Sequence, residues 1–121
     1  MKLTELHSDD RGKIFILNED LGHPELTIFT TKKGFARGGC IHHQNKENVC
    51  VISGKIKYVF STTTLYLTTG ESFTIPKSTP HYFLSVTDSV VAEWGATAEE
   101  KIEKHLEFRK IVENINKVGI I

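Results

Sequence analysis

The sequence predicts an all-β sandwich or barrel followed by one amphipathic helix at the C-terminal end. Seven or eight short runs rich in β-branched and aromatic residues follow one another along the chain, separated by turn-forming residues. No helical pattern lies between these runs, so a fold of alternating β and α units is not indicated. Only the end of the chain changes to a helical period.

The predicted strands begin with residues 12–18 and 26–31, which are bounded by the turn formers in SDDRG and NEDLGHP. Six further runs have the same composition and are separated by short breaks of Gly, Ser, Thr, Asp or Pro. They cover residues 48–54, 55–61, 64–70, 71–80, 81–86 and 89–95.

The final segment is predicted to form a helix over about residues 97–118. Its apolar residues include Phe108, Ile111, Val112 and Ile115, the spacing of one helical face. Thr97 followed by Glu100 fits a capping box, and Gly119 fits the end of the helix. The apolar face could cover the chain's own barrel or a partner subunit, and the sequence leaves both arrangements open.

Length and composition restrict the class of protein. The 121 residues predict a single domain, with the barrel over about residues 1–95. The 15 basic and 15 acidic side chains balance, which argues against nucleic acid as a partner. The apolar runs are too short to span a bilayer, which argues against a membrane protein. With two cysteines and a charged start, MKLTELHSDDRGK, the chain is predicted to be cytoplasmic.

Two stretches carry side chains that could act on a ligand. In the first, five residues separate Gly34 from Cys40, one separates Cys40 from His42, four separate His42 from Glu47, and six separate Glu47 from Gly54. On a strand, positions 40 and 42 share one face, and a turn through HQNK can return Glu47 to the same place.

In the second stretch, five residues separate Gly70 from Pro76, one separates Pro76 from Ser78, two separate Ser78 from His81, and three separate His81 from Ser85. The two prolines of PKSTP end a strand and fix a loop, so His81 can enter the interior from a different strand.

Together the two stretches resemble the two motifs of the cupin superfamily, with Cys40 at the position of the first histidine and Ser78 at that of the usual glycine. The resemblance implies a jelly-roll barrel, the double-stranded β-helix fold. It also implies that His42, Glu47 and His81 converge inside the barrel, and such a donor set suits one divalent transition metal ion, Zn, Fe, Mn or Ni. Cys40 could add a thiolate. The adjacent His43 points to the opposite face of a regular strand and is predicted to be a bystander.

A second resemblance, carried by DDRGKIFIL, ARGG and EFRKIVENI, is to the nucleotide-sugar cupins, the dTDP-4-keto-6-deoxyglucose ketoisomerases and dTDP-sugar 3,5-epimerases. It implies a nucleotide-sugar substrate, proton transfer next to a keto group, no cofactor, and a homodimer. In this interpretation His42 and Cys40 serve in catalysis with an opposite acid, Tyr82 or Tyr58. Arg37, His81 and Tyr58 are the residues expected to contact the substrate. The planar guanidinium of Arg37 suits phosphate oxygens.

Three functions therefore stay open from the sequence. The first is a sugar-nucleotide isomerase or epimerase, the second a metal-dependent cupin enzyme, and the third a non-catalytic module that senses a ligand or a metal ion. Cys40 stands where the ketoisomerases have histidine, and Glu47 restores the metal-type residue where they tend to have glutamine. The role of Cys40 therefore separates the three hypotheses.

Overall fold

The computed structural model of the protein describes residues 2–18, 26–95 and 102–119. Its eleven strands and one helix are ordered as follows: β1 Lys2–Asp9, β2 Gly12–Asn18, β3 Leu26–Thr31, β4 Ala36–His42, β5 Glu47–Ser53, β6 Lys55–Phe60, β7 Thr63–Thr68, β8 Ser72–Ile75, β9 His81–Ser85, β10 Ser89–Trp94, β11 Ile102–Lys104 and α1 Leu106–Gly119. The predicted all-β fold with a C-terminal helix is confirmed.

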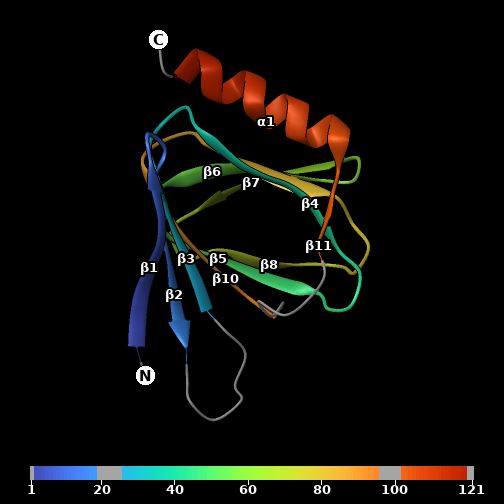
Figure 1. Ribbon diagram of the computed structural model, residues 1–121, viewed down its shortest axis with the longest axis horizontal. Helices are drawn as coiled ribbons and strands as arrows, with labels where there is room; N and C mark the ends of the chain where they lie inside the picture. Colours follow the sequence, from blue (N-terminus) through green and yellow to red (C-terminus); the bar gives the residue numbers. More distant parts are fainter. Residues whose placement is uncertain (1, 19–25, 96–101, 120–121) are drawn as a thin grey trace.

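Two antiparallel sheets face each other and enclose the interior of the barrel (Figure 1). One has the order β1-β2-β3-β10-β5-β8, and the other has the order β11-β4-β9-β6-β7. Neighbours in a sheet are often distant in sequence, as β10 is from both β3 and β5. This non-sequential antiparallel order is that of a jelly roll.

The main core lies between the sheets because alternate residues of each strand point inward. Val49 and Val51 of β5 meet Ile56 of β6 and Phe83 of β9, and all four are buried. Two members of the cluster, Tyr58 and Phe83, also line the cavity inside the barrel. The core thereby supports the site described below.

Helix α1 lies on the outer face of the sheet that contains β4 and β9, so it covers its own barrel (Figure 1). Phe108 and Val112 are buried there, with Ile111 and Ile115 packed beside them, which confirms the predicted apolar face. Within the described residues, no helix is long and apolar enough to cross a membrane.

The predicted start of the helix was wrong. Residues 102–104 form strand β11, which pairs with the edge of β4, and the helix begins only at Leu106. Pairing with β4 satisfies backbone groups that a helix would otherwise satisfy, so the tertiary contact overrides the local helical pattern. The proposed capping pair, Thr97 and Glu100, lies outside the described residues. The helix is instead capped by His105, whose Nδ1 accepts the N–H of Phe108 at 3.3 Å.

Replacing Asn116 by alanine is expected to lower the free energy of unfolding by about 1–3 kcal/mol. The side-chain amide of Asn116 joins α1 to the start of β4: its Oδ1 accepts the N–H of Ala36 at 2.8 Å, and its Nδ2 donates to the Ala36 carbonyl at 3.1 Å. Ala36 is fully buried, so its N–H would lose a partner that water cannot replace. Urea unfolding measures the change. The exposed Asn114→Ala is the control, and equal losses in both variants would contradict this role.

Candidate functional site

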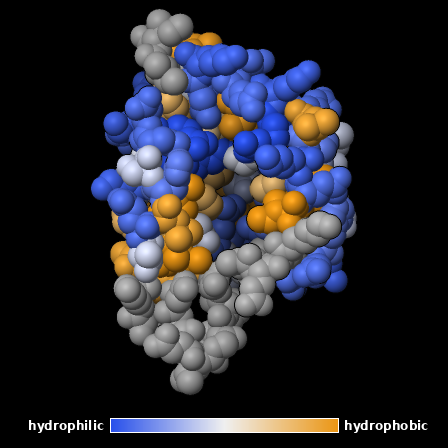
Figure 2. All heavy atoms as spheres, viewed as in Figure 1, coloured by the Kyte–Doolittle hydropathy of each residue, from blue (hydrophilic) through white to orange (hydrophobic). Residues whose placement is uncertain are grey.

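A cavity of about 310 Å³ opens inside the barrel beside the main core. Figure 2 shows this face of the molecule hollowed between two apolar surfaces. Leu6, Trp94 and Ile102 line the cavity and are partly exposed, so they form an apolar rim. The titratable side chains that line the cavity come from five strands of both sheets. They are Arg37, Cys40, His42, Glu47, Tyr58, His81 and Glu93.

A bulge in β4 sets the direction of Cys40 and His42. The ladder between β4 and β9 shifts between Gly38 and Cys40, where Gly38 and Gly39 both have positive φ. A β carbon on Gly39 would lie 3.0 Å from the backbone nitrogen of Arg109 in α1. Glycine is therefore needed where the helix approaches the strand. The next residue, Cys40, and then His42 line the cavity, as the two-residue spacing predicted.

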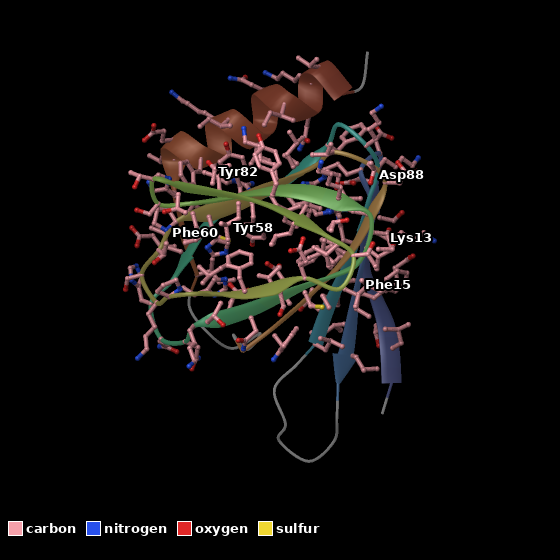
Figure 3. All side chains as sticks on the ribbon, turned by 180° about the vertical axis from the view of Figure 1, so that it is seen from behind. Lys13, Phe15, Tyr58, Phe60, Tyr82 and Asp88 are labelled. Carbon is pink, nitrogen blue, oxygen red and sulfur yellow. The ribbon has the colours of Figure 1, made fainter. Side chains whose placement is uncertain are left out.

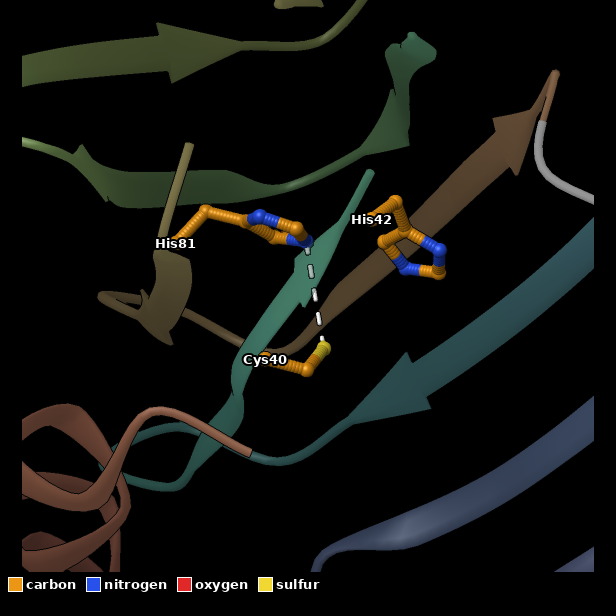
Figure 4. Close-up of side chains that lie close together, drawn as sticks. All are labelled: Cys40, His42 and His81. Carbon is orange, nitrogen blue, oxygen red and sulfur yellow. Dashed lines mark hydrogen bonds between the residues drawn. The ribbon is translucent and has the colours of Figure 1, made fainter. Parts of the chain in front are cut away.

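The four side chains predicted as metal donors converge in this cavity. The donor atoms of Cys40, His42 and His81 all lie within 4.8 Å of one another (Figure 4). Cys40 Sγ lies 4.0 Å from Nε2 of His81. Glu47 completes the group, because its Oε1 lies 2.5 Å from Nε2 of His42 and 3.5 Å from Nε2 of His81. We call these four residues the donor cluster.

Proton affinities in the donor cluster are strongly coupled. Burial disfavours the charged forms, but the contacts between opposite charges outweigh it. Hydrogen bonds from His42 and His81 lower the pKa of Glu47 to about 2. Hydrogen bonds to Cys40 and Glu47 raise the pKa of His42 to about 10 and that of His81 to about 11. The two imidazoles lower the pKa of Cys40 to about 7. Without a bound ion, both histidines therefore carry protons at neutral pH.

Arg37 lies at the side of the cavity and is only 3% exposed. Its Nε donates to Oγ1 of Thr31 at 2.9 Å, its Nη2 donates to the carbonyl of Thr30 at 3.1 Å, and the guanidinium lies over the ring of Phe29. Burial lowers its pKa to about 10, so it stays charged at neutral pH. Its Nη1 has no hydrogen-bond partner among the described residues. A buried donor without a partner is costly, and a bound anion would satisfy it.

The structure separates the two tyrosines considered as acids. Tyr58 lies between the sheets and lines the cavity, whereas Tyr82 lies on the side of α1 (Figure 3). The ring of Tyr82 packs edge-to-face on Phe108, with centroids 5.0 Å apart. The placement of Tyr82 in the site is therefore corrected. It follows His81 directly on β9, and adjacent residues of a strand point to opposite faces of the sheet.

His43 lies outside the cavity, as predicted for a bystander. Its Nδ1 lies 2.8 Å from Oγ of Ser78, and its Nε2 lies 2.5 Å from a carboxylate oxygen of Glu103 in β11. Both His43 and Glu103 are exposed. These contacts tie β11 to the neighbouring turn, which holds Ile102 at the rim of the cavity.

The family model described as a cupin domain matches residues 27–97. The match covers more than half of the chain and both motifs. The chain belongs to the cupin family. No curated protein sequence matches this cupin significantly.

Solved structures agree on the fold. The capsular polysaccharide assembling protein CapF from Staphylococcus aureus is 24% identical, with a TM-score of 0.69 over 79% of this cupin and 31% of that chain. An oxalate decarboxylase from Bacillus subtilis is 17% identical, with a TM-score of 0.71 over 87% of this cupin and 30% of that chain. KdgF from Halomonas sp. is 15% identical, with a TM-score of 0.66 over 79% of this cupin and 88% of that chain. This cupin thus spans less than a third of the first two chains.

Sequence reasoning missed one titratable residue of the cavity, Glu93. It lies on β10, where the inward positions Ser89 and Val91 precede it by steps of two. A charged residue in the inward register of an otherwise apolar strand is the signal that could have revealed it.

Proposed function

We propose that this cupin is an enzyme that processes a small molecule in the barrel cavity and binds one divalent transition metal ion there through Cys40, His42, Glu47 and His81. The observation that carries the proposal is the convergence of the donor cluster in a cavity large enough for a small ligand. Two imidazoles, a carboxylate and a thiolate form a donor set that zinc and iron accept.

The donor separations support such a site. With bonds of about 2.0–2.3 Å, neighbouring donors of a tetrahedral zinc site lie roughly 3.3–3.6 Å apart. The separations of His81 Nε2 from Glu47 Oε1, 3.5 Å, and from Cys40 Sγ, 4.0 Å, are close to this range. The contact between His42 Nε2 and Glu47 Oε1, 2.5 Å, is an ion pair and is shorter. The two histidines must therefore lose their protons before they donate to an ion.

The purified, untagged protein is expected to contain up to one zinc, iron, manganese or nickel ion per chain, measured by elemental analysis. His81→Ala removes one donor and is expected to lower this content severalfold. His43→Ala is the matched control, because His43 is also a histidine beside the site but lies outside the cavity. Protein without metal that also fails to bind any of the four added ions would rule out the metal site.

For the reaction, we propose proton transfer next to a keto group of a nucleotide-linked sugar, the reaction that the resemblance to the ketoisomerases and epimerases implies. That resemblance by itself implies no cofactor, and the metal ion is a separate part of this proposal that rests on the donor cluster. Arg37 supports an anionic ligand, since its Nη1 has no hydrogen-bond partner among the described residues, and phosphate oxygens pair well with a guanidinium. A bound divalent ion polarises a carbonyl oxygen, which makes a neighbouring C–H bond more acidic. Arg37 holds the phosphate, and the apolar rim limits the access of water to the cavity.

Incubation of dTDP-4-keto-6-deoxyglucose with the metal-loaded protein in D₂O is expected to place deuterium next to the keto group, as followed by NMR. Arg37→Gln is expected to weaken binding of the nucleotide sugar. If the protein binds metal but neither binds nor exchanges this compound, the nucleotide-sugar reaction is wrong. If a broad set of other small molecules is also unchanged, the non-catalytic sensor is favoured.

A further inference from the structure

Glu93 is a buried carboxyl group that forms no ion pair with any residue that the structure describes. It lies on β10 in the middle of a sheet, is 8% exposed, and lines the cavity together with the donor cluster. Burying a carboxyl group without a counter-charge is costly, so an apolar residue would give a more stable barrel. No ion pair to Glu93 occurs within 4 Å among residues 2–18, 26–95 and 102–119. Its evident contribution to the fold is to accept the hydrogen bond of the buried Tyr58 phenol.

Tyr58 fixes the position of this carboxyl group. The phenol of Tyr58, on β6 of the opposite sheet, donates a hydrogen bond of 2.7 Å to Oε1 of Glu93. The Tyr58 ring is held by an edge contact with Phe73 and by Phe83 and His81 on its other sides. Burial and the charge of Glu93 raise the pKa of Tyr58 well above its usual value, so it stays a donor. The second oxygen of Glu93 has no hydrogen bond within the described residues.

Among the described residues that line the cavity, Glu93 is the one left to move protons when the donor cluster is occupied. Cys40, His42, Glu47 and His81 cannot serve as bases while they donate to an ion. Of the remaining titratable groups that line the described part of the cavity, Arg37 and Tyr58 hold their protons firmly. A general acid or base works best when its pKa lies near the working pH.

The charges around Glu93 place it in that range. Burial and the negative charges of Glu47 and Cys40 raise its pKa, while His81 and the hydrogen bond from Tyr58 oppose the rise. The pKa is raised to about 7. This value applies to the donor cluster without an ion. Replacing the two imidazole protons by one divalent ion leaves the net charge of the cluster unchanged, so the carboxyl group can still accept and release a proton near neutral pH.

We propose that Glu93 is a catalytic residue that takes a proton from the carbon next to the keto group of the bound ligand, onto the carboxyl oxygen that Tyr58 leaves free. The C–H bond breaks, its electron pair moves to the keto oxygen as an enolate, and the proton stays on Glu93. Return of the proton to carbon reforms the keto group. Tyr58 is a positioning residue. This inference rests on the reaction proposed above.

The test compares deuterium exchange into dTDP-4-keto-6-deoxyglucose by the zinc-loaded wild type, Glu93→Gln, Tyr58→Phe and the control Glu113→Gln, which lies on an exposed position of α1. Glu93→Gln is expected to slow exchange by about 100-fold or more with zinc content unchanged. Tyr58→Phe removes a hydrogen bond that favours the ionised carboxylate, so the midpoint of the pH–rate profile should move upward. A loss of fold alone would not move that midpoint.

The outcomes separate the two proposals. If the wild type exchanges deuterium and Glu93→Gln does so at the same rate, the role of Glu93 is overturned and the proposed reaction stays intact. No exchange by the wild type overturns the reaction and this inference with it. Carboxyl ¹³C NMR gives an independent reading: the resonance lost in Glu93→Gln is expected to titrate near neutral pH in the wild type. Titration in the range of an ordinary glutamate would also overturn the proposal.

Discussion

The affinity of the donor cluster for Zn²⁺ is expected to rise about a hundredfold for each unit of pH between about pH 7 and pH 9. His42 and His81 have pKa values raised to about 10 and 11, so both imidazoles are protonated throughout this range in the metal-free protein. Both must release a proton to bind the ion, and each released proton changes the affinity about tenfold per pH unit. Glu47, with a pKa of about 2, releases none.

Competition with a chromophoric chelator at several pH values measures this slope, after correction for the protons that the chelator itself releases. Histidines with an ordinary pKa of about 6.5 would be neutral above pH 7 and would add nothing to the slope. His43→Ala leaves the donor cluster intact and should retain the wild-type slope. A slope below one proton would show that the imidazoles are not held in their charged form by Glu47 and Cys40.

In the metal-free protein, Glu93→Gln is expected to raise the free energy of unfolding by about 3 kcal/mol at pH 8 and to leave it nearly unchanged at pH 4. The pKa of Glu93 is raised from 4.5 to about 7 on folding. Between these values the folded state binds a proton that the unfolded state lacks, so stability falls as the pH rises through this window. Above this pH window, the free energy of unfolding of the wild type stays lowered by the full cost of burying the charge. Glutamine has no charge and keeps an oxygen that can accept the hydrogen bond from Tyr58.

Urea unfolding of both proteins at a series of pH values measures the difference. Only the difference between variant and wild type is informative, because other carboxyl groups titrate in the acid range. Exposed Glu113→Gln should change stability by less than about 0.5 kcal/mol at every pH. A Glu93→Gln variant that is no more stable than the wild type at pH 8 would mean that Glu93 is not buried at a cost.

The features that were predictable from the sequence depend on local spacing. Strand alternation places Cys40 and His42 on one face, and the motif spacing brings Glu47 and His81 to them. The apolar face of α1 followed from the period of Phe108, Ile111, Val112 and Ile115. In each case the spacing of the residues along the chain shows which face of the strand or helix they share.

The features that were missed depend on contacts between distant segments. β11 forms because residues 102–104 meet the open edge of β4, about 60 residues earlier in the chain, and no local pattern records that edge. Glu93 becomes a cavity residue only because Tyr58 of the other sheet lies opposite to it. The placement of Tyr82 in the site failed for a simpler reason. Alternation along β9 already implied that His81 and Tyr82 face opposite sides.

That alternation also joins the outer surface of the barrel to its interior. His81 is followed by Tyr82, on which Phe108 of α1 packs, and Cys40 is preceded by Gly39, which Arg109 of α1 approaches. Two donors are thus one peptide unit away from the helix. A small displacement of α1 would therefore change the distance between the thiol of Cys40 and the imidazole of His81. We expect substitutions on the inner face of the helix to change which metal ion the proposed site prefers, without any change to the residues that line the cavity.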